Sequence, residues 1–138
     1  PDQGWRPYWH ENMIWYGPAA FGSFIGIENF ASFQVPFEQC FSSWTGGAVE
    51  GSETRHFIRC ADGHYVCSGG WPSLNAFQTG TFLDQPATNK MLYMRVCDWW
   101  RRQDEKLVEN WVFVDIPHDL LQMGLDLFAG LNVPGHHE

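Results

Sequence analysis

The chain has 138 residues, of which 16 are acidic and 8 are Lys or Arg, so its formal charge is −8 at pH 7. A chain of this length fits one domain, here residues 1–138, and can bury roughly two thirds of its unfolded surface. Apart from Arg101 and Arg102 the basic side chains are scattered, so a stripe that could follow a phosphate backbone is missing. The acidic balance and the lack of an apolar run of about 20 residues argue against a membrane partner. We therefore expect a soluble, cytoplasmic protein that binds neither nucleic acid nor membrane.

Cysteine and histidine spacing gives no sign of a metal site. The cysteines lack CxxC spacing, and no signal peptide opens the chain, so we expect reduced and mostly buried thiols. Two of the six histidines lie in the terminal PGHHE segment, and the other four share no ligand spacing. The sequence therefore predicts neither a metal nor a cofactor. The cysteines are Cys40, Cys60, Cys67 and Cys97.

The first half of the chain predicts a strand followed by a helix. Residues 12–16 (NMIWY) have strand character and are ended by Gly17 and Pro18. Aromatic residues then recur near helical spacing over residues 27–41, although Pro36 must start a new turn or kink the helix. A helix that lays these aromatic side chains on a sheet fits the pattern, and packing in the core is their favoured role.

A first hairpin is predicted in the middle of the chain. Residues 54–60 and 64–68 read as strands, and Asp62-Gly63 between them is a strong signal for a tight turn. The two strands should be antiparallel neighbours. A polar loop over residues 75–90 follows.

Residues 95–115 (RVCDWWRRQDEKLVENWVFVD) predict a second, longer hairpin, because Val, Trp, Phe and Cys fill both arms around a polar turn. Residues 120–131 then close the chain as a short apolar helix or tail. The order of elements predicts an α+β fold with helices on one face of a strongly curved antiparallel sheet. Such a sheet encloses a cavity, and apolar walls with a few polar groups make it a site for a small molecule.

The register of the long hairpin decides which side chains face that cavity. A two-residue turn at residues 104 and 105 places Trp99 opposite Asn110 on the pocket face. The same register places Asp98 beside Trp111 on the other face. A bulge in either strand would shift one arm and exchange its faces.

Four segments carry a resemblance to a known family: ENMIWYGP, the later GW, the loop TGTFLDQPATNK, and the long hairpin. In order and spacing they resemble the SnoaL-like polyketide cyclases and the related ester cyclases of the nuclear transport factor 2-like superfamily, over residues 5–126. The resemblance implies a cone-shaped α+β fold with a deep pocket, and a homodimer formed through the outer sheet face. Members usually have helices ahead of the first strand. Barely a dozen residues precede it here, so we expect a chain that lacks those helices, as a trimmed chain, a second tandem domain or a divergent member would.

The residues depart from the mechanisms that the resemblance implies. In the polyketide cyclases an acid/base Asp follows a Trp on the last strand, and the matching position is Val112 after Trp111, which cannot transfer a proton. The loop position that often holds a His is Gln78. The sibling limonene-epoxide hydrolases use first-strand and third-strand residues whose positions fall here on Tyr16 with Ile14 and on Gly70 with Pro72, so that catalytic set is missing too.

Three functions remain open. The first is a cyclase or isomerase that uses acid/base chemistry on a cyclic or aromatic carbonyl compound, with Asp98, His56 or His64 as the catalytic candidate. The second is a binding module for a small hydrophobic organic molecule without turnover, which Val112 favours. The third is a self-association domain with an aromatic outer face that carries Trp100 and Trp111. The residues that we expect to line the ligand pocket are Ile14, Tyr16, Trp71, Gln78, Arg95, Trp99, Asn110 and Val112.

Overall fold

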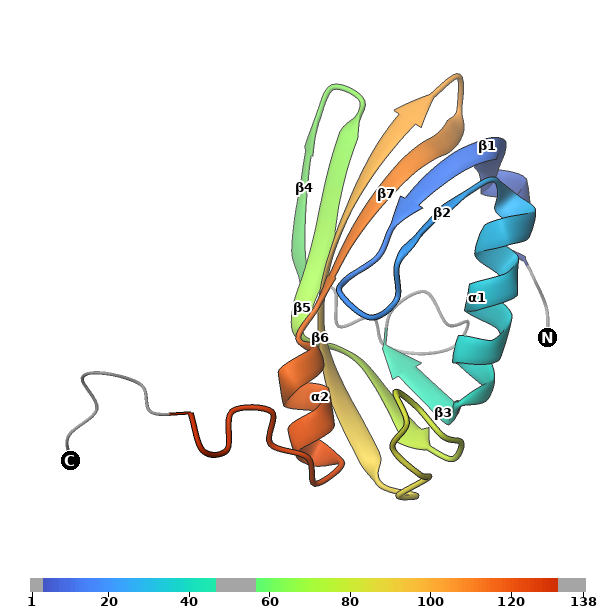
Figure 1. Cartoon of the computed structure of the whole chain (residues 1–138). Coiled ribbons are helices and arrows are strands. Elements are labelled where there is room, and N and C mark those ends of the chain that lie inside the picture. Colours follow the sequence, from blue (N-terminus) through green and yellow to red (C-terminus); the bar gives the residue numbers. More distant parts are fainter. Residues whose placement is uncertain (1–3, 47–56, 132–138) are drawn as a thin grey trace.

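The computed structural model describes residues 4–46 and 57–131. Its elements run in the order η1 (Arg6–Tyr8), β1 (Trp9–Tyr16), β2 (Ser23–Ile25), α1 (Ile27–Gln39), β3 (Phe41–Gly46), β4 (Ile58–Asp62), β5 (Tyr65–Gln78), β6 (Met91–Gln103), β7 (Lys106–Val114) and α2 (Ile116–Gln122). The seven strands form one curved sheet, and α1 stands across its open side (Figure 1). The predicted α+β fold is confirmed.

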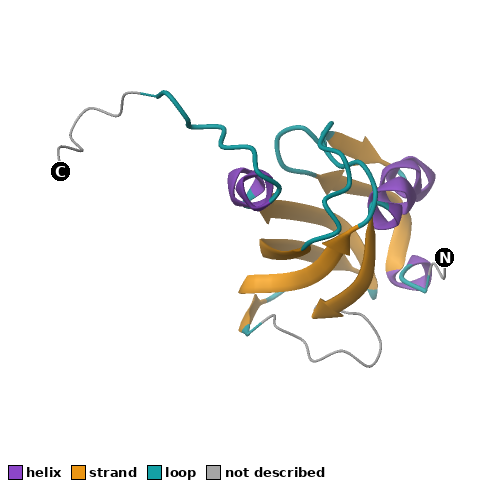
Figure 2. Ribbon diagram, turned by 90° about the horizontal axis from the view of Figure 1, so that it is seen from below, coloured by secondary structure: helices purple, strands orange, loops and turns teal. Residues whose placement is uncertain are grey.

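The sheet has the strand order β2-β1-β7-β6-β5-β3, with β4 paired to β5. Every described pair is antiparallel except β1 with β7, which run parallel. The prediction of a wholly antiparallel sheet is therefore wrong in this one pair. Residues 17–105 lie between β1 and β7, which is ample length for the crossover that a parallel pair needs. Viewed from below, the sheet is curved and α1 lies beside it (Figure 2).

Helix α1 follows from the aromatic spacing that the sequence showed. It begins after Gly26, whose φ of 86° is accessible at little cost only to glycine, and it ends at Gln39. Pro36 lies inside the helix, which ends three residues later. Phe33 and Phe37 stack with an interplanar angle of 18°, and the Phe33 ring lies 4.9 Å from that of Trp15 on β1, so the aromatic stripe faces the sheet.

The predicted turn of the long hairpin is confirmed. Gln103 pairs with Lys106, and the two turn residues Asp104 and Glu105 have φ values of 47° and 63°. Two left-handed residues in succession match the right-handed twist of the flanking strands, which is why such turns close hairpins.

The register beyond that turn is shifted by a β-bulge. Arg102 pairs with Leu107, but Arg101 pairs with Glu109, so one residue of β7 is left without a partner on β6. The extra residue shifts every later position of β7 by one residue relative to β6. The β6 side chains that were expected on one face of the sheet therefore lie on the other face. The predicted register was therefore wrong.

The bulge brings Asp98 opposite Val112 and Trp100 opposite Asn110. Because side chains alternate along a strand, Asp98 and Trp100 share one face and Trp99 takes the other. The aromatic outer face is consequently formed with Trp99, and not with Trp100 as predicted.

The first hairpin is confirmed as an antiparallel pair, β4 with β5, although the turn residues are Gly63 and His64 because Asp62 already pairs with Tyr65. Residues 54–56 of the predicted strand lie outside the described residues. The predicted loop begins at residue 79, since β5 continues to Gln78.

The last helix, α2, begins earlier than the sequence indicated. Asp115 caps it, because its carboxylate accepts a hydrogen bond from the backbone N–H of His118 at 3.2 Å. Leu120 and Met123 pack into the core against β6 and its neighbours. Among the described residues, no helix is long and apolar enough to cross a bilayer.

Candidate functional site

A cavity of about 780 Å³ lies between α1 and the concave face of the sheet. Ten of its 21 lining residues are aromatic: Trp5, Tyr8, Trp9, Trp15, Phe21, Phe30, Phe33, Phe37, Phe82 and Trp100. Apolar aliphatic side chains of β6 and β7 complete the floor. This volume and composition are typical of sites that enclose a small organic molecule.

Asp98 stands in the floor of this cavity, on β6. Its carboxylate accepts one hydrogen bond, from the Asn110 side-chain amide at 3.3 Å, and Asn110 is fixed by a second bond to the carbonyl of Trp99 at 3.0 Å. Burial raises the pKa of Asp98 from 3.8 to about 6, and the Asn110 hydrogen bond offsets part of that rise. None of the ion pairs among the described residues includes Asp98. The group is thus a carboxylate without a counter-cation in a largely apolar site.

Asp119 of α2 lines the same cavity. Its side chain is among the most buried in the protein, with an exposure of 1%, and its Oδ1 atom has no hydrogen-bond partner among the described residues. Burial, followed by the negative charge of Asp115, raises the pKa of Asp119 from 3.8 to about 8, while Arg95 acts in the opposite direction. At neutral pH the Asp119 carboxyl group therefore keeps its proton.

The remaining polar side chains of the lining are engaged or neutral. Gln34 donates a hydrogen bond to the Glu38 carboxylate at 2.7 Å within α1, and Tyr8 contributes a phenol. The described residues include no group of three or more His, Cys, Asp or Glu side chains that could hold a metal ion. The chemistry of the cavity therefore rests on its carboxyl groups.

No model of a known protein family matches the chain, and neither does any curated protein. Solved structures do match. A presumed SnoaL-like polyketide cyclase from Jannaschia sp. CCS1 aligns with 88% of this chain and 75% of its own, at 19% identity and a TM-score of 0.70. IdmH from Streptomyces antibioticus, a presumed polyketide cyclase, aligns over 87% and 84% at 17% identity and a TM-score of 0.66. This chain has a SnoaL-like fold.

A further match is a protein of ketosteroid isomerase-like fold from Catenulispora acidiphila, solved in complex with trimethylamine. It covers 86% of this chain and 78% of its own, at 10% identity and a TM-score of 0.62. At these identities the likeness establishes the fold alone. The predicted resemblance to the SnoaL-like polyketide cyclases is confirmed at the level of the fold.

Two of the eight predicted pocket residues, Asn110 and Val112, line the cavity of this SnoaL-like fold, together with the catalytic candidate Asp98. The other six do not line it: Ile14, Tyr16, Trp71, Gln78, Arg95 and Trp99.

On β1 the predicted face is off by one residue. Met13 and Trp15 are buried, so the alternating Ile14 and Tyr16 point to the opposite side of the sheet. Tyr16 stacks there on Trp111 with an interplanar angle of 2°. The pocket assignment of Ile14 and Tyr16 is therefore corrected to the outer face.

Arg95 and Trp71 also lie away from the cavity. The Arg95 guanidinium bonds the Asp115 carboxylate at 3.1 Å and sits 5.0 Å from the centre of the Trp71 ring. Trp71 is 56% exposed. Trp99 is exposed on the outer face because of the bulge. Arg95 and Trp71 therefore form a cation–π pair at the surface, and neither lines the cavity as predicted.

Gln78 is fully buried and supports a loop instead of a ligand. Its Oε1 accepts hydrogen bonds from the backbone N–H and the hydroxyl of Thr88, at 3.1 and 2.7 Å. Its Nε2 lies within hydrogen-bonding distance of the carbonyls of Gly80, Gln85 and Pro86. One amide therefore holds together the loop between β5 and β6.

Gln78→Leu should destabilise the protein by about 2–4 kcal/mol, because it leaves several buried loop groups without partners. Urea unfolding measures this loss. Gln103→Ala, at the exposed hairpin turn, is the matched control and should change stability by less than about 0.5 kcal/mol. Equal effects of the two substitutions would contradict the role assigned to Gln78.

Of the two histidine candidates, only His64 is among the described residues, and it does not line the cavity. His56 lies outside the described residues. His64 is exposed in the β4–β5 turn, where its carbonyl accepts a bond from the Arg102 N–H at 2.8 Å. Sequence reasoning missed Asp119, for which the signal was an acid within the apolar stretch from Ile116 to Leu121.

Proposed function

We propose that this protein binds a cyclic or aromatic carbonyl compound in its cavity, and that Asp98 removes a proton from a carbon activated by the carbonyl group. The observation that carries this proposal is the Asp98 carboxylate in the floor of an aromatic cavity, with an amide as its only hydrogen-bond partner given by the described contacts. A pKa of about 6 leaves it ionised at pH 7 and still basic enough to accept a proton.

The position of Asp98 supports the same proposal. The resemblance assigns the acid/base Asp of the polyketide cyclases to the position of Val112, and Val112 is the direct cross-strand partner of Asp98. Both side chains line the cavity. Asp98 on β6 therefore supplies a carboxylate to the cavity next to the position on β7 where the resemblance places one.

This placement weighs against the purely binding alternative. That alternative rested on Val112 as evidence for a cavity without an ionisable group. Since Asp98 and Asp119 both line the cavity, acid/base chemistry accounts for the costly burial of two carboxyl groups, whereas simple retention of an apolar ligand does not.

The test is deuterium exchange into a panel of cyclic and aromatic ketones in D2O, followed by NMR. We expect the protein to speed exchange at carbons activated by the carbonyl, well above the buffer rate. Thermal shifts with the same compounds report binding separately. Binding without any exchange would contradict the catalytic part of the proposal, and a lack of both would contradict the whole.

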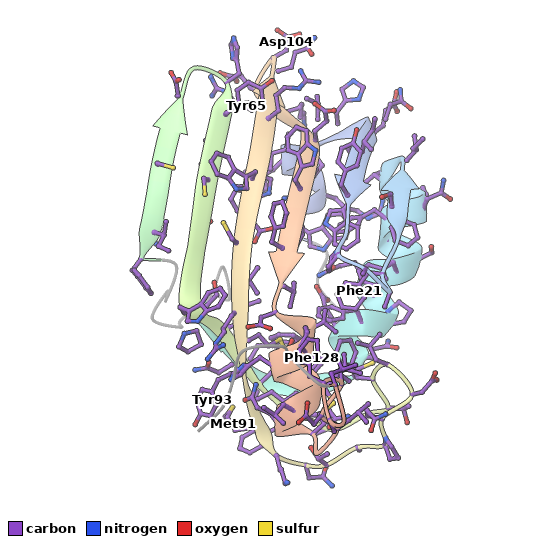
Figure 3. The ribbon with its side chains drawn as sticks, turned by 60° about the vertical axis from the view of Figure 1, so that its left-hand side comes forward. Phe21, Tyr65, Met91, Tyr93, Asp104 and Phe128 are labelled. Atoms are coloured by element: carbon purple, nitrogen blue, oxygen red, sulfur yellow. The ribbon has the colours of Figure 1, made fainter. Side chains whose placement is uncertain are left out.

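A homodimer through the outer sheet face is a further part of the proposal. Tyr65, Trp99, Trp111 and Phe113 surround a shallow apolar depression there, and Trp99 and Phe113 are 42% and 59% exposed. Figure 3 looks toward this side of the sheet, with Tyr65 near the Asp104 turn at one end and Tyr93 near the other. Clustered exposed aromatic side chains of this kind support burial against a second copy.

Trp99→Glu should therefore weaken self-association by at least about 100-fold, because it puts a charge into the aromatic patch. Sedimentation equilibrium measures the effect. Leu121→Glu, at an exposed apolar residue of helix α2 outside the sheet, should leave association unchanged. A wild-type protein that stays monomeric at high concentration would contradict this part.

We also propose a cytoplasmic location. The four cysteines are free thiols, and the sulfur atoms of Cys67 and Cys97 lie 3.7 Å apart without a bond. Free thiols this close together are compatible with a reducing compartment. The expectation of mostly buried thiols is wrong, because only Cys67 is buried, Cys40 and Cys97 are partly exposed, and Cys60 is exposed.

A further inference from the structure

Three of the four cysteines form a row across neighbouring strands on the outer face of the sheet. Cys60 on β4 pairs with Cys67 on β5, and Cys67 in turn pairs with Trp99 on β6. Partners directly opposite one another in a sheet share a face. Cys97 lies two residues before Trp99 on the same strand, so its side chain points to that face as well. Three thiols from three adjacent strands therefore lie side by side.

The sulfur atoms of Cys67 and Cys97 are in contact, at a distance of 3.7 Å. A disulfide bond needs about 2 Å, which rotation of the two side chains supplies when the strands lie close together. The strands do approach closely here, because Gly69, the cross-strand partner of Cys97, has no side chain. A Cβ atom at Gly69 would lie 3.1 Å from the Cα of Cys97 and 2.7 Å from the Val96 carbonyl oxygen.

The three thiols differ in their access to solvent. Cys67 is 3% exposed, Cys97 is partly exposed and Cys60 is exposed. Burial, followed by the neighbouring thiols of Cys97 and Cys60, raises the pKa of Cys67 to about 12, so Cys67 keeps its proton at neutral pH. The thiolate is the nucleophile in thiol chemistry. An oxidant from solution therefore reacts first at a more accessible thiol, beside which Cys67 stands as the second partner.

We propose that Cys67 and Cys97 are a redox-active dithiol, which a small-molecule disulfide such as oxidised glutathione converts into a disulfide bond between β5 and β6. The Cys97 thiolate attacks one sulfur atom of the small disulfide, and the first small thiolate leaves. The Cys67 sulfur then attacks the Cys97 sulfur and displaces the second small thiolate. The protons of both cysteines pass to the two released thiolates. Two protein thiols are thus oxidised while one small disulfide is reduced to two thiols.

The dithiol is independent of the cavity chemistry proposed above, because it lies on the opposite face of the sheet. Cys67 faces Trp99, which together with Tyr65 borders the apolar depression of the outer face. The bond would therefore join the two strands that carry these aromatic side chains. In a reducing compartment such a bond is transient, and the pair would respond to the ratio of oxidised to reduced small thiols.

The test incubates the whole chain with excess oxidised glutathione, then unfolds it in iodoacetamide and counts free thiols by mass spectrometry. We expect two of the four thiols to be lost, with a mass about 2 Da below that of the reduced protein before alkylation. Peptide mapping should place the bond between Cys67 and Cys97, and dithiothreitol should restore all four thiols. Cys97→Ser should slow formation of an internal bond by at least about 10-fold and accumulate a glutathione adduct instead. Cys67→Ala should show the same loss.

Cys40→Ser and Cys60→Ser are the matched controls, and both should form the internal bond at the wild-type rate. Cys40 lies apart from the row, since its thiol donates to the carbonyls of Pro36 and Thr81 at 3.3 and 3.2 Å. A bond that persists in Cys97→Ser but is lost in Cys60→Ser would overturn the proposed pair in favour of Cys60 with Cys67. Four free thiols in the oxidised wild type, glutathione adducts without an internal bond, or bonds formed only between two chains would each overturn the inference.

Discussion

Asp98→Asn should lower the rate of deuterium exchange into a bound cyclic ketone by about 10³-fold, because a general base contributes roughly 10²–10⁴-fold to such a step and an amide cannot accept the proton. Ligand affinity should change little, since the two side chains have nearly the same shape. Exchange measured at saturating ketone, beside a binding isotherm, separates the two effects. Asp62→Asn supplies the matched substitution away from the cavity. Tighter or looser binding with an unchanged rate constant would contradict a role as base.

The pH dependence of exchange carries a second signature of Asp98. The base acts only when ionised, so the rate should rise about tenfold per pH unit below the pKa of about 6 and level off above it. The hydrogen bond from Asn110 lowers that pKa. Asn110→Leu should therefore move the rising limb to higher pH, whereas Asp98→Asn should abolish it.

The fold was predictable from local signals, and the faces of its strands were not. Asp104 and Glu105 stand between two arms rich in strand-forming residues, which is enough to place the turn. The bulge next to it depends on how β7 fits between β6 and β1, and β1 itself shifts register against β7 between Trp9 and Ile14. One unpaired residue sufficed to move Asp98 from the outer face to the cavity.

The parallel pairing of β1 with β7 was also beyond local sequence reasoning. Alternation of apolar and polar residues looks the same whichever way the neighbouring strand runs, so residues 12–16 indicated a strand without a direction. The sequence also could not show which side chains of this strand face the core, because Met13 and Ile14 are equally suited to it.

Asp119 shows the corresponding limit for the site. In the sequence it is one acid within a short amphipathic segment, where a solvated position is the usual outcome. Its burial arises only when α2 packs against β6 and places the carboxyl group at the cavity. Three-dimensional packing, and not residue pattern, makes it a candidate.

The cost of burying Asp119 leads to a prediction about stability. Its pKa is about 8 in the folded chain and returns to about 3.8 when the chain unfolds. Between those values the folded chain holds a proton that the unfolded chain has released. The contribution of this group to stability is therefore fully present below about pH 4 and is lost as the pH rises through about 8. Asp98 acts in the same direction up to about pH 6.

Asp119→Asn removes this titration and should stabilise the protein increasingly as the pH rises. The free energy of unfolding of the variant should exceed that of the wild type by about 1.4 kcal/mol more for each pH unit above about pH 4, up to a few kcal/mol near pH 8. Urea unfolding of both proteins at pH 4, 6 and 8 measures the difference in their free energies of unfolding. The titration of all other groups is common to both proteins and cancels in this difference. Asp62→Asn should show no such trend.

The expected gain also bears on why Asp119 is buried in the wall of the cavity. A substitution that stabilises the protein while it removes the titration of a cavity group is the pattern of a residue kept for activity at the expense of stability. If Asp119→Asn were less stable than the wild type at pH 8, the buried carboxyl group would have a structural partner, and the cost assigned to its burial would be contradicted. If the difference between the two proteins were the same at pH 4 and pH 8, the pKa of Asp119 would be close to its ordinary value, and burial would not hold its proton at neutral pH.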